Sequence, residues 1–195
     1  MTNNPRGLRL GLLAAGILLL GTAAAMAGRN LWNQYRAGEQ TSRLLELTEQ
    51  RIAGEPLPEP GDAAQADPLA GYAVDGILSL PQLGLELPVL ADYSDELLGV
   101  SVCLYEREPK TGRMVIAGHN YRVHFGRLGE LEPGDTITYT ALDGSRTGYQ
   151  VTGLDTIAAD DREGLEEGSW DLTLLTCTAD LSDRLLVRLE RAGEH

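Results

Sequence analysis

Hydrophobic and polar positions divide the chain into three parts, and the first part is an unbroken apolar run. After Arg6 and Arg9, the stretch Leu10–Gly28 has no charge and is rich in Leu, Ala and Gly. A helix rises about 1.5 Å per residue, so Leu8–Ala27 reaches roughly 30 Å, the thickness of a bilayer core. We therefore predict a signal anchor over residues 1–29. A cleaved secretory signal is the alternative, because Ala25-Met26-Ala27 fits a small-x-small cleavage site.

The second part, residues 30–70, is predicted to be a stalk. Leucines recur at roughly helical spacing among Glu, Gln and Arg over Asn30–Ile52, which indicates a helix. We interpret this helix as a solvated stalk with no binding role. The run Gly54–Gly61 contains three prolines and ends the helix, and with the stretch to Pro68 it forms a linker.

The third part, residues 71–195, changes to short apolar runs separated by turn residues. Helical turns are expected at Asp92–Leu98, capped by Ser94, at His124–Leu131 and at the acidic Asp160–Glu167. Asp143-Gly144 is a hairpin turn. Many short strands with little helix between them predict an all-β domain, a closed or nearly closed β-barrel. The expected strands are Val74–Leu80, Leu85–Leu90, Met114–Ala117, Thr136–Thr140, Arg146–Leu154, Leu172–Thr176 and Leu185–Leu189.

Charge and cysteine content narrow the function. The 195 residues carry 16 Lys and Arg against 29 Asp and Glu, a formal charge of −13, which argues against a nucleic-acid binder. The two cysteines are Cys103 and Cys177. We expect Cys103 to be a free, buried thiol, although a Cys103–Cys177 disulfide fits an exported domain as well.

One set of residues suggests a chemistry. Cys177 closes an apolar, strand-forming run, His119 follows another such run after Gly118, and Arg184 begins the last strand. A cysteine nucleophile, a histidine that moves protons and an arginine that steadies an oxyanion are the parts of thiolate acyl transfer. Pairing of adjacent strands would bring Arg184 near Cys177. A buried structural thiol and a core histidine are the competing interpretations.

The other histidines and arginines are assigned to ordinary roles. His195 is terminal, and His124 is expected to be a surface or capping residue. Arg188 and Arg191 are expected to lie on a solvent-facing edge that discourages aggregation.

These motifs together resemble the sortases, the surface transpeptidases of Gram-positive bacteria. Thr173–Cys177 is similar to the Thr-Leu-x-Thr-Cys signature, Val115–Asn120 to the segment with the sortase histidine, and Arg184–Val187 to the arginine strand. Gly76–Pro81 followed by Leu87–Val89 resembles the opening strands. The resemblance covers about residues 71–191, and Gly118–Phe125 is most similar to class B-like sortases.

The resemblance implies a fold, a reaction and partners. The fold would be an eight-stranded sortase-type barrel behind the membrane anchor. Cys177 would cleave a Leu-Pro-x-Thr-Gly-like sorting signal of surface proteins and pass the acyl group to an amine, either of a cell-wall precursor or of a pilin-like lysine. His119 would be the acid and base, Arg184 the oxyanion partner, and Thr176 and Asn120 would bind substrate.

The expected location is the cell membrane, in a single pass, with an extracellular catalytic domain. No cofactor is expected. Calcium bound by the acidic segment Asp160–Glu167 is the disfavoured alternative, because ion ligands usually follow a recognisable loop spacing. Two alternatives to a transpeptidase stay open: a cysteine peptidase that hydrolyses peptides, and a non-catalytic anchored β-domain that binds cell-wall material.

Overall fold

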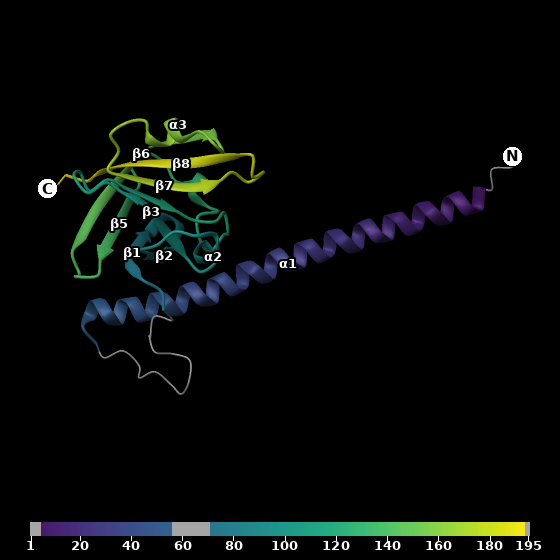
Figure 1. Cartoon of the computed structure of the whole chain (residues 1–195), viewed down its shortest axis with the longest axis horizontal. Coiled ribbons are helices and arrows are strands. Elements are labelled where there is room, and N and C mark those ends of the chain that lie inside the picture. The colour runs from purple at the N-terminus through teal and green to yellow at the C-terminus, as the bar shows by residue number, and fades with distance from the viewer. Residues whose placement is uncertain (1–4, 56–70, 194–195) are drawn as a thin grey trace. The chain divides into compact units, whose positions relative to one another are not determined.

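A long amino-terminal helix precedes a β-barrel in the computed structural model, which describes residues 5–55 and 71–193 (Figure 1). The predicted anchor and stalk helices form one element, α1 (Pro5–Ala53). The chain divides into two compact units, residues 1–36 and 37–195. In the first unit Leu12, Leu13, Leu18, Leu19 and Leu20 are exposed, and α1 from Gly11 onward is long and apolar enough to cross a membrane. The predicted linker from Pro56 to Pro68, the region before Pro5 and His195 lie outside the described residues.

The second unit contains a closed barrel of eight strands, as predicted. The order around the barrel is β1-β2-β3-β4-β7-β8-β6-β5. Pairs β2–β3 and β4–β7 are parallel, and the other pairs are antiparallel. The strands are β1 (Val74–Leu80), β2 (Leu85–Leu90), β3 (Val102–Arg107), β4 (Met114–Ala117), β5 (Thr136–Ala141), β6 (Arg146–Ala158), β7 (Leu172–Cys177) and β8 (Asp183–Arg191).

Seven of these strands match the predicted runs, and β3 has no counterpart among them. Its sequence Val-Cys-Leu-Tyr-Glu-Arg is apolar at the start and charged at the end, so it lacks the alternation that marks a half-buried strand. The predicted cap and hairpin are confirmed: Ser94 accepts a hydrogen bond from the Leu97 N–H, and Asp143 from the Ser145 N–H. The predicted helix at His124–Leu131 is wrong in extent, since only a 3₁₀ turn forms there.

Short helical elements connect the strands. They are the 3₁₀ turns η1 (Pro81–Leu83) and η2 (Leu128–Glu130) and the helices α2 (Asp95–Leu98) and α3 (Arg162–Glu166). The helix predicted over the acidic segment Asp160–Glu167 is therefore confirmed in shortened form.

The barrel interior is filled by alternate residues of each strand. Leu172 and Leu174 of β7 and Val187 and Leu189 of β8 are fully buried in the same apolar cluster as Phe125. Because side chains alternate between the two faces of a strand, the residues between them point outward. This packed interior supports the side chains that the strands present on the outer face of the barrel.

A second apolar cluster lies on the outer face, and part of α1 covers it. Leu44 and Leu47 of α1 pack with Cys103 and Ala117, which belong to β3 and β4. The buried stripe of this helix is Ala37, Thr41, Leu44, Leu47 and Thr48, each at most 8% exposed. The expected solvated stalk is therefore wrong for residues 37–48. The error has a physical cause: the leucine spacing marks a helix face but does not reveal what covers it.

The prediction for Arg188 is also wrong. It was expected on a solvent-facing edge, but it is 2% exposed and lies beneath α3. Its guanidinium donates hydrogen bonds to the carbonyl oxygens of Gly164 and Leu165 and to the Thr173 hydroxyl, and it pairs with Asp155. An outward-facing arginine is thus the group that fastens α3 to the barrel. Arg191 is exposed, as expected.

Replacement of Arg188 by Met should lower the free energy of unfolding by about 1–3 kcal/mol, because the carbonyls of α3 lose their buried donors. Arg191→Met is the matched control on the same strand. Its ion pair with Asp171 spans 3.9 Å at a half-exposed position, so the change should be under about 1 kcal/mol. Urea unfolding of the full chain in detergent measures both. Equal losses in the two variants would contradict the structural role of Arg188.

Candidate active site

Strands β4 and β7 are neighbours in the barrel, although more than fifty residues separate them in the chain. They run parallel, and Ala117 is opposite Leu175. His119 lies two residues past Ala117, and Cys177 lies two residues past Leu175. The register therefore brings His119 and Cys177 to the same end of two adjacent strands.

Hydrogen bonds continue this pairing beyond the end of β4. The Gly118 N–H donates to the Leu175 carbonyl at 3.0 Å, and the Thr176 hydroxyl donates to the Gly118 carbonyl at 2.9 Å. The Asn120 amide donates to the Thr178 carbonyl at 3.3 Å. Three bonds thus join the residues around His119 to the residues on both sides of Cys177.

Gly118 makes this close approach possible. A Cβ at this position would lie 2.7 Å from the Phe125 ring and 2.9 Å from Val102. Neither neighbour can withdraw easily, because both are fully buried in the core. The residue before His119 must therefore be glycine for the segment to lie flat against the barrel.

Arg184 is directly opposite Cys177 in the antiparallel pair β7–β8. Side chains of opposite residues share a face, with Cβ atoms about 4.5–5.5 Å apart. Both side chains point outward, because Leu174 and Val187, at odd separation from them, lie in the interior cluster. Both are partly exposed. The structure thus brings together the backbones of the three predicted residues at one end of β4, β7 and β8.

The two cysteines are free and differ in their surroundings. Cys103 is fully buried, and burial raises the pKa of its thiol to about 12. Because the thiolate is the reactive form of cysteine, the protonated Cys103 thiol is expected to be unreactive at neutral pH. Cys177 is only partly buried, at a strand end. The expectation of a free, buried Cys103 is confirmed.

Burial also affects His119. It lowers the pKa of the imidazole, and the negative charge of Asp95 on α2 opposes this shift. Near Arg184 lies Tyr93, whose pKa is raised chiefly by burial and also by Asp95, whereas Arg184 acts in the opposite direction. Tyr93 is 45% exposed, and its ring packs edge-on against Tyr105. The segment around Tyr93 and Asp95 therefore borders the site. No motif in the sequence indicated this.

The structure contradicts the prediction that His124 is a surface or capping residue. It is 0% exposed, and burial lowers the pKa of its imidazole to about 4, with a smaller effect from His119. The Tyr121 ring contacts both histidines, with centroid distances of 5.0 Å to His119 and 5.8 Å to His124. A histidine next to an apolar Phe125 in a turn-rich segment could equally be exposed, so sequence alone could not place it.

Thr176 and Asn120, predicted to bind substrate, hydrogen-bond to the protein in this structure. The single hydroxyl hydrogen of Thr176 is donated to Gly118, and Thr176 is 3% exposed. Both residues fasten the His119 segment to the Cys177 strand, and their contact with substrate stays a prediction.

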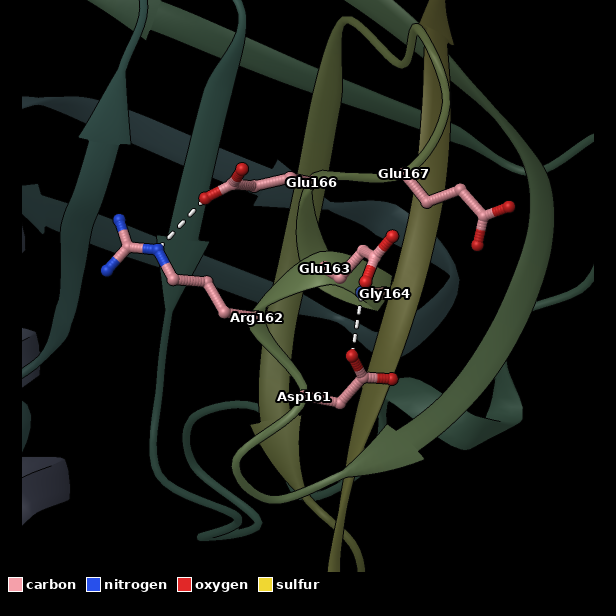
Figure 2. Close-up of a pocket in the computed structure, with 6 residues that line it drawn as sticks. All are labelled: Asp161, Arg162, Glu163, Gly164, Glu166 and Glu167. Carbon is pink, nitrogen blue, oxygen red and sulfur yellow. Dashed lines mark hydrogen bonds and ion pairs between the residues drawn. The ribbon is translucent and has the colours of Figure 1, made fainter.

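The acidic segment forms a separate hollow beside α3 (Figure 2). Its carboxylates point in different directions: Glu166 pairs with Arg162, Asp161 accepts from the Gly164 N–H, and Glu167 points away. Within residues 5–55 and 71–193, no group of three or more His, Cys, Asp or Glu residues could hold a metal ion.

Comparison with known proteins identifies the family. The model of the sortase domain matches residues 78–192, more than half of the chain. The chain belongs to the sortase family. It is therefore a cysteine transpeptidase, and its apolar helix suggests a membrane-anchored protein.

Individual sortases are similar along most of the chain. Sortase A of Bacillus anthracis is 27% identical over 91% of this chain and 92% of its own length. The solved structure of sortase C1 from Streptococcus agalactiae is 27% identical, with a TM-score of 0.56 over 80% of this chain and 90% of that one. Sortase A of Corynebacterium diphtheriae, at 22% identity, supports the fold, with a TM-score of 0.58 over 89% of this chain and 97% of that one. These relatives are named sortase A or C, so the class B-like subclass stays a prediction.

The contrast between the cysteines is testable by alkylation. Iodoacetamide at pH 7 should label the native full chain at Cys177 and leave Cys103 unmodified, because only Cys177 is accessible. Peptide mass spectrometry locates the label, and Cys103→Ala should retain it whereas Cys177→Ala should lose it. Labelling of Cys103 at a comparable rate would contradict the assignment.

The burial of His124 predicts a pH dependence of stability. Its folded-state pKa of about 4 lies below the ordinary 6.5, so between these values the unfolded chain binds a proton that the folded chain does not. This contribution to stability is complete above pH 6.5 and is lost as the pH falls to about 4, with a slope of at most about 1.4 kcal/mol per pH unit. Urea unfolding at several pH values should show a steeper loss in the wild type than in His124→Gln. Parallel curves would contradict the burial of a neutral His124.

Proposed function

We propose that Cys177 is the nucleophile of this sortase and that His119 and Arg184 complete its catalytic set. The observation that supports this is the set of hydrogen bonds from Gly118, Thr176 and Asn120, which aligns the two strand ends, with Arg184 opposite Cys177. Family membership alone would not select these residues from the other arginines and histidines.

The steps of the proposed reaction follow from the proton transfers that His119 can make. His119 has a lowered pKa and is mostly neutral at neutral pH, so it can accept the proton of the Cys177 thiol. The thiolate attacks the scissile carbonyl carbon, and the negative charge moves to the carbonyl oxygen. The protonated His119 then gives its proton to the departing amine, which leaves a thioester on Cys177. In the second half, His119 takes a proton from the incoming amine as that amine attacks the thioester. The carbon–sulfur bond then breaks, which releases the new amide and the Cys177 thiolate, and the proton on His119 returns to the sulfur.

Arg184 is proposed to stabilise the oxyanion of both tetrahedral intermediates. Arg184 is directly opposite Cys177 in the strand pair, and its guanidinium has a planar set of N–H donors and a fixed positive charge. Its guanidinium donates a hydrogen bond to the Asp183 carbonyl that is long, at 3.4 Å. Breaking such a bond to bind an oxyanion costs little.

The substrate is proposed to be a Leu-Pro-x-Thr-Gly-like sorting signal on a surface protein, cleaved between Thr and Gly. The acceptor is an amine of a cell-wall precursor or a pilin-like lysine. The catalytic domain is proposed to be extracellular, held by a single membrane pass of α1. No cofactor enters this scheme, because every proton and charge in it is handled by the three side chains.

The test is peptide transfer by the full chain in detergent, followed by mass spectrometry. A library of Leu-Pro-x-Thr-Gly peptides, incubated with and without an amine acceptor, should give acyl transfer to the amine. Cys177→Ala should abolish transfer, His119→Gln should lower it about 10²- to 10⁴-fold, and Arg184→Lys about 10²- to 10³-fold.

Matched controls are available for two of these variants. Cys103→Ala and Arg191→Lys change the other cysteine and an arginine at the far end of the same strand, and both should keep transfer within a few-fold of the wild type. Full turnover by Cys177→Ala would refute the nucleophile. Cleavage without transfer to any amine would instead indicate a peptidase.

A further inference from the structure

We propose that Thr41 of α1 is a positioning residue of the active site, which holds the His119 loop in place through His124. The inference rests on the proposed role of His119. It starts from a buried contact between α1 and the loop: the Thr41 Oγ1 lies 2.9 Å from the His124 Nε2 and 2.7 Å from the Val100 carbonyl oxygen. Both side chains are at most 5% exposed.

Hydrogen counting determines the direction of these bonds. A hydroxyl has one hydrogen, and a carbonyl oxygen can only accept, so the Thr41 hydroxyl donates to Val100. It must then accept from His124, which places the ring hydrogen on Nε2. The Nδ1 is the bare nitrogen, and among the described residues it has no hydrogen-bond partner. His124 is thus a neutral ring in a defined tautomer, and its lowered pKa agrees with this.

His124 is linked to His119 along the loop in two ways. The His124 N–H donates to the Tyr121 carbonyl, and the next residue, Phe125, donates its N–H to the carbonyl of His119 itself. The Tyr121 ring also contacts the rings of both histidines. A shift of His124 therefore changes the position of the His119 backbone and the packing of its ring. Because misplacement of a catalytic group by about 1 Å costs up to about 10²-fold in rate, the tether affects catalysis.

The rest of the buried stripe on α1 acts differently. Leu44 and Leu47 make apolar contacts, and the Thr48 hydroxyl bonds to the Leu44 carbonyl within α1. Thr48 is as buried as Thr41, but its bond does not leave the helix. The two threonines therefore separate a polar tether to the loop from a general contribution to helix packing.

The experiment compares Thr41→Val with Thr48→Val in the full chain in detergent, by sorting-peptide transfer kinetics. Each variant deletes one buried hydroxyl from the same helix without a large change in volume. Thr41→Val should lower kcat about 10- to 100-fold with little change in KM, and Thr41→Ser should restore it. Thr48→Val should keep kcat close to the wild-type value. Equal kcat in the two Val variants would overturn the proposal.

A second readout does not need activity, and its first result comes from the wild-type chain alone. Nuclear magnetic resonance of the wild-type chain with isotope-labelled histidine should show one ring with hydrogen on Nε2 that exchanges slowly with water, and Thr41→Val should lose this slow exchange. A His124 ring that carries hydrogen on Nδ1, or exchanges fast, would overturn the proposal. Absence of transfer in the wild type, with the slow ring signal present, would instead count against the proposed function.

Discussion

The parallel pairing of β4 and β7 is the constraint on which the site depends. Parallel neighbours end at the same edge of a sheet, and they need a long connection; here β5, β6 and α3 lie between them in the chain. The bonds from Gly118 and Asn120 to Leu175 and Thr178 extend the pairing to His119 and Cys177, the two residues proposed to carry the chemistry. A slip of one residue would turn Cys177 inward and Thr176 outward, because side chains alternate along a strand.

Part of the outer face of the barrel is apolar, and a helix buries it. Cys103, Ala117 and Leu175, on three adjacent strands, form an apolar surface just before the strand ends that carry His119 and Cys177. Burial of apolar area stabilises by about 25 cal/mol per Å², so a helix with a leucine face is stabilised when it packs there. Residues 37–48 of α1 provide that face. The segment that follows the apolar part of α1 is therefore part of the support of β4 and β7, the strands that lead to His119 and Cys177.

Sequence patterns predicted what depends on local alternation and on a family signature: seven strands, the Ser94 cap, the Asp143-Gly144 turn and the membership in the sortases. They failed where an outward-facing residue is covered by another element. Arg188 and Leu44 both have neighbours in sequence that suggest a solvent-facing surface, and both are buried, beneath α3 and against the barrel respectively. The sequence pattern did not predict β3, because the charged residues at its end interrupt the apolar pattern of its buried first residues. Whether another element covers an outward-facing residue depends on the tertiary structure, whereas the alternation of apolar and polar residues distinguishes only the two faces of a strand.

The three outward side chains of β7 show what these covers achieve. Thr173 lies beneath α3, where Arg188 donates to its hydroxyl and to the carbonyls of the helix. Leu175 packs into the cluster that α1 covers. Cys177 is the next outward-facing residue of β7 and lies beyond Thr173 and Leu175. The two helices, each held by a buried polar residue of the barrel or its loop, thus cover part of the outer face of β7 before Cys177, the proposed nucleophile. Cys177 is the last residue of β7 and is partly exposed, with Arg184 opposite it and His119 just past the end of the neighbouring strand.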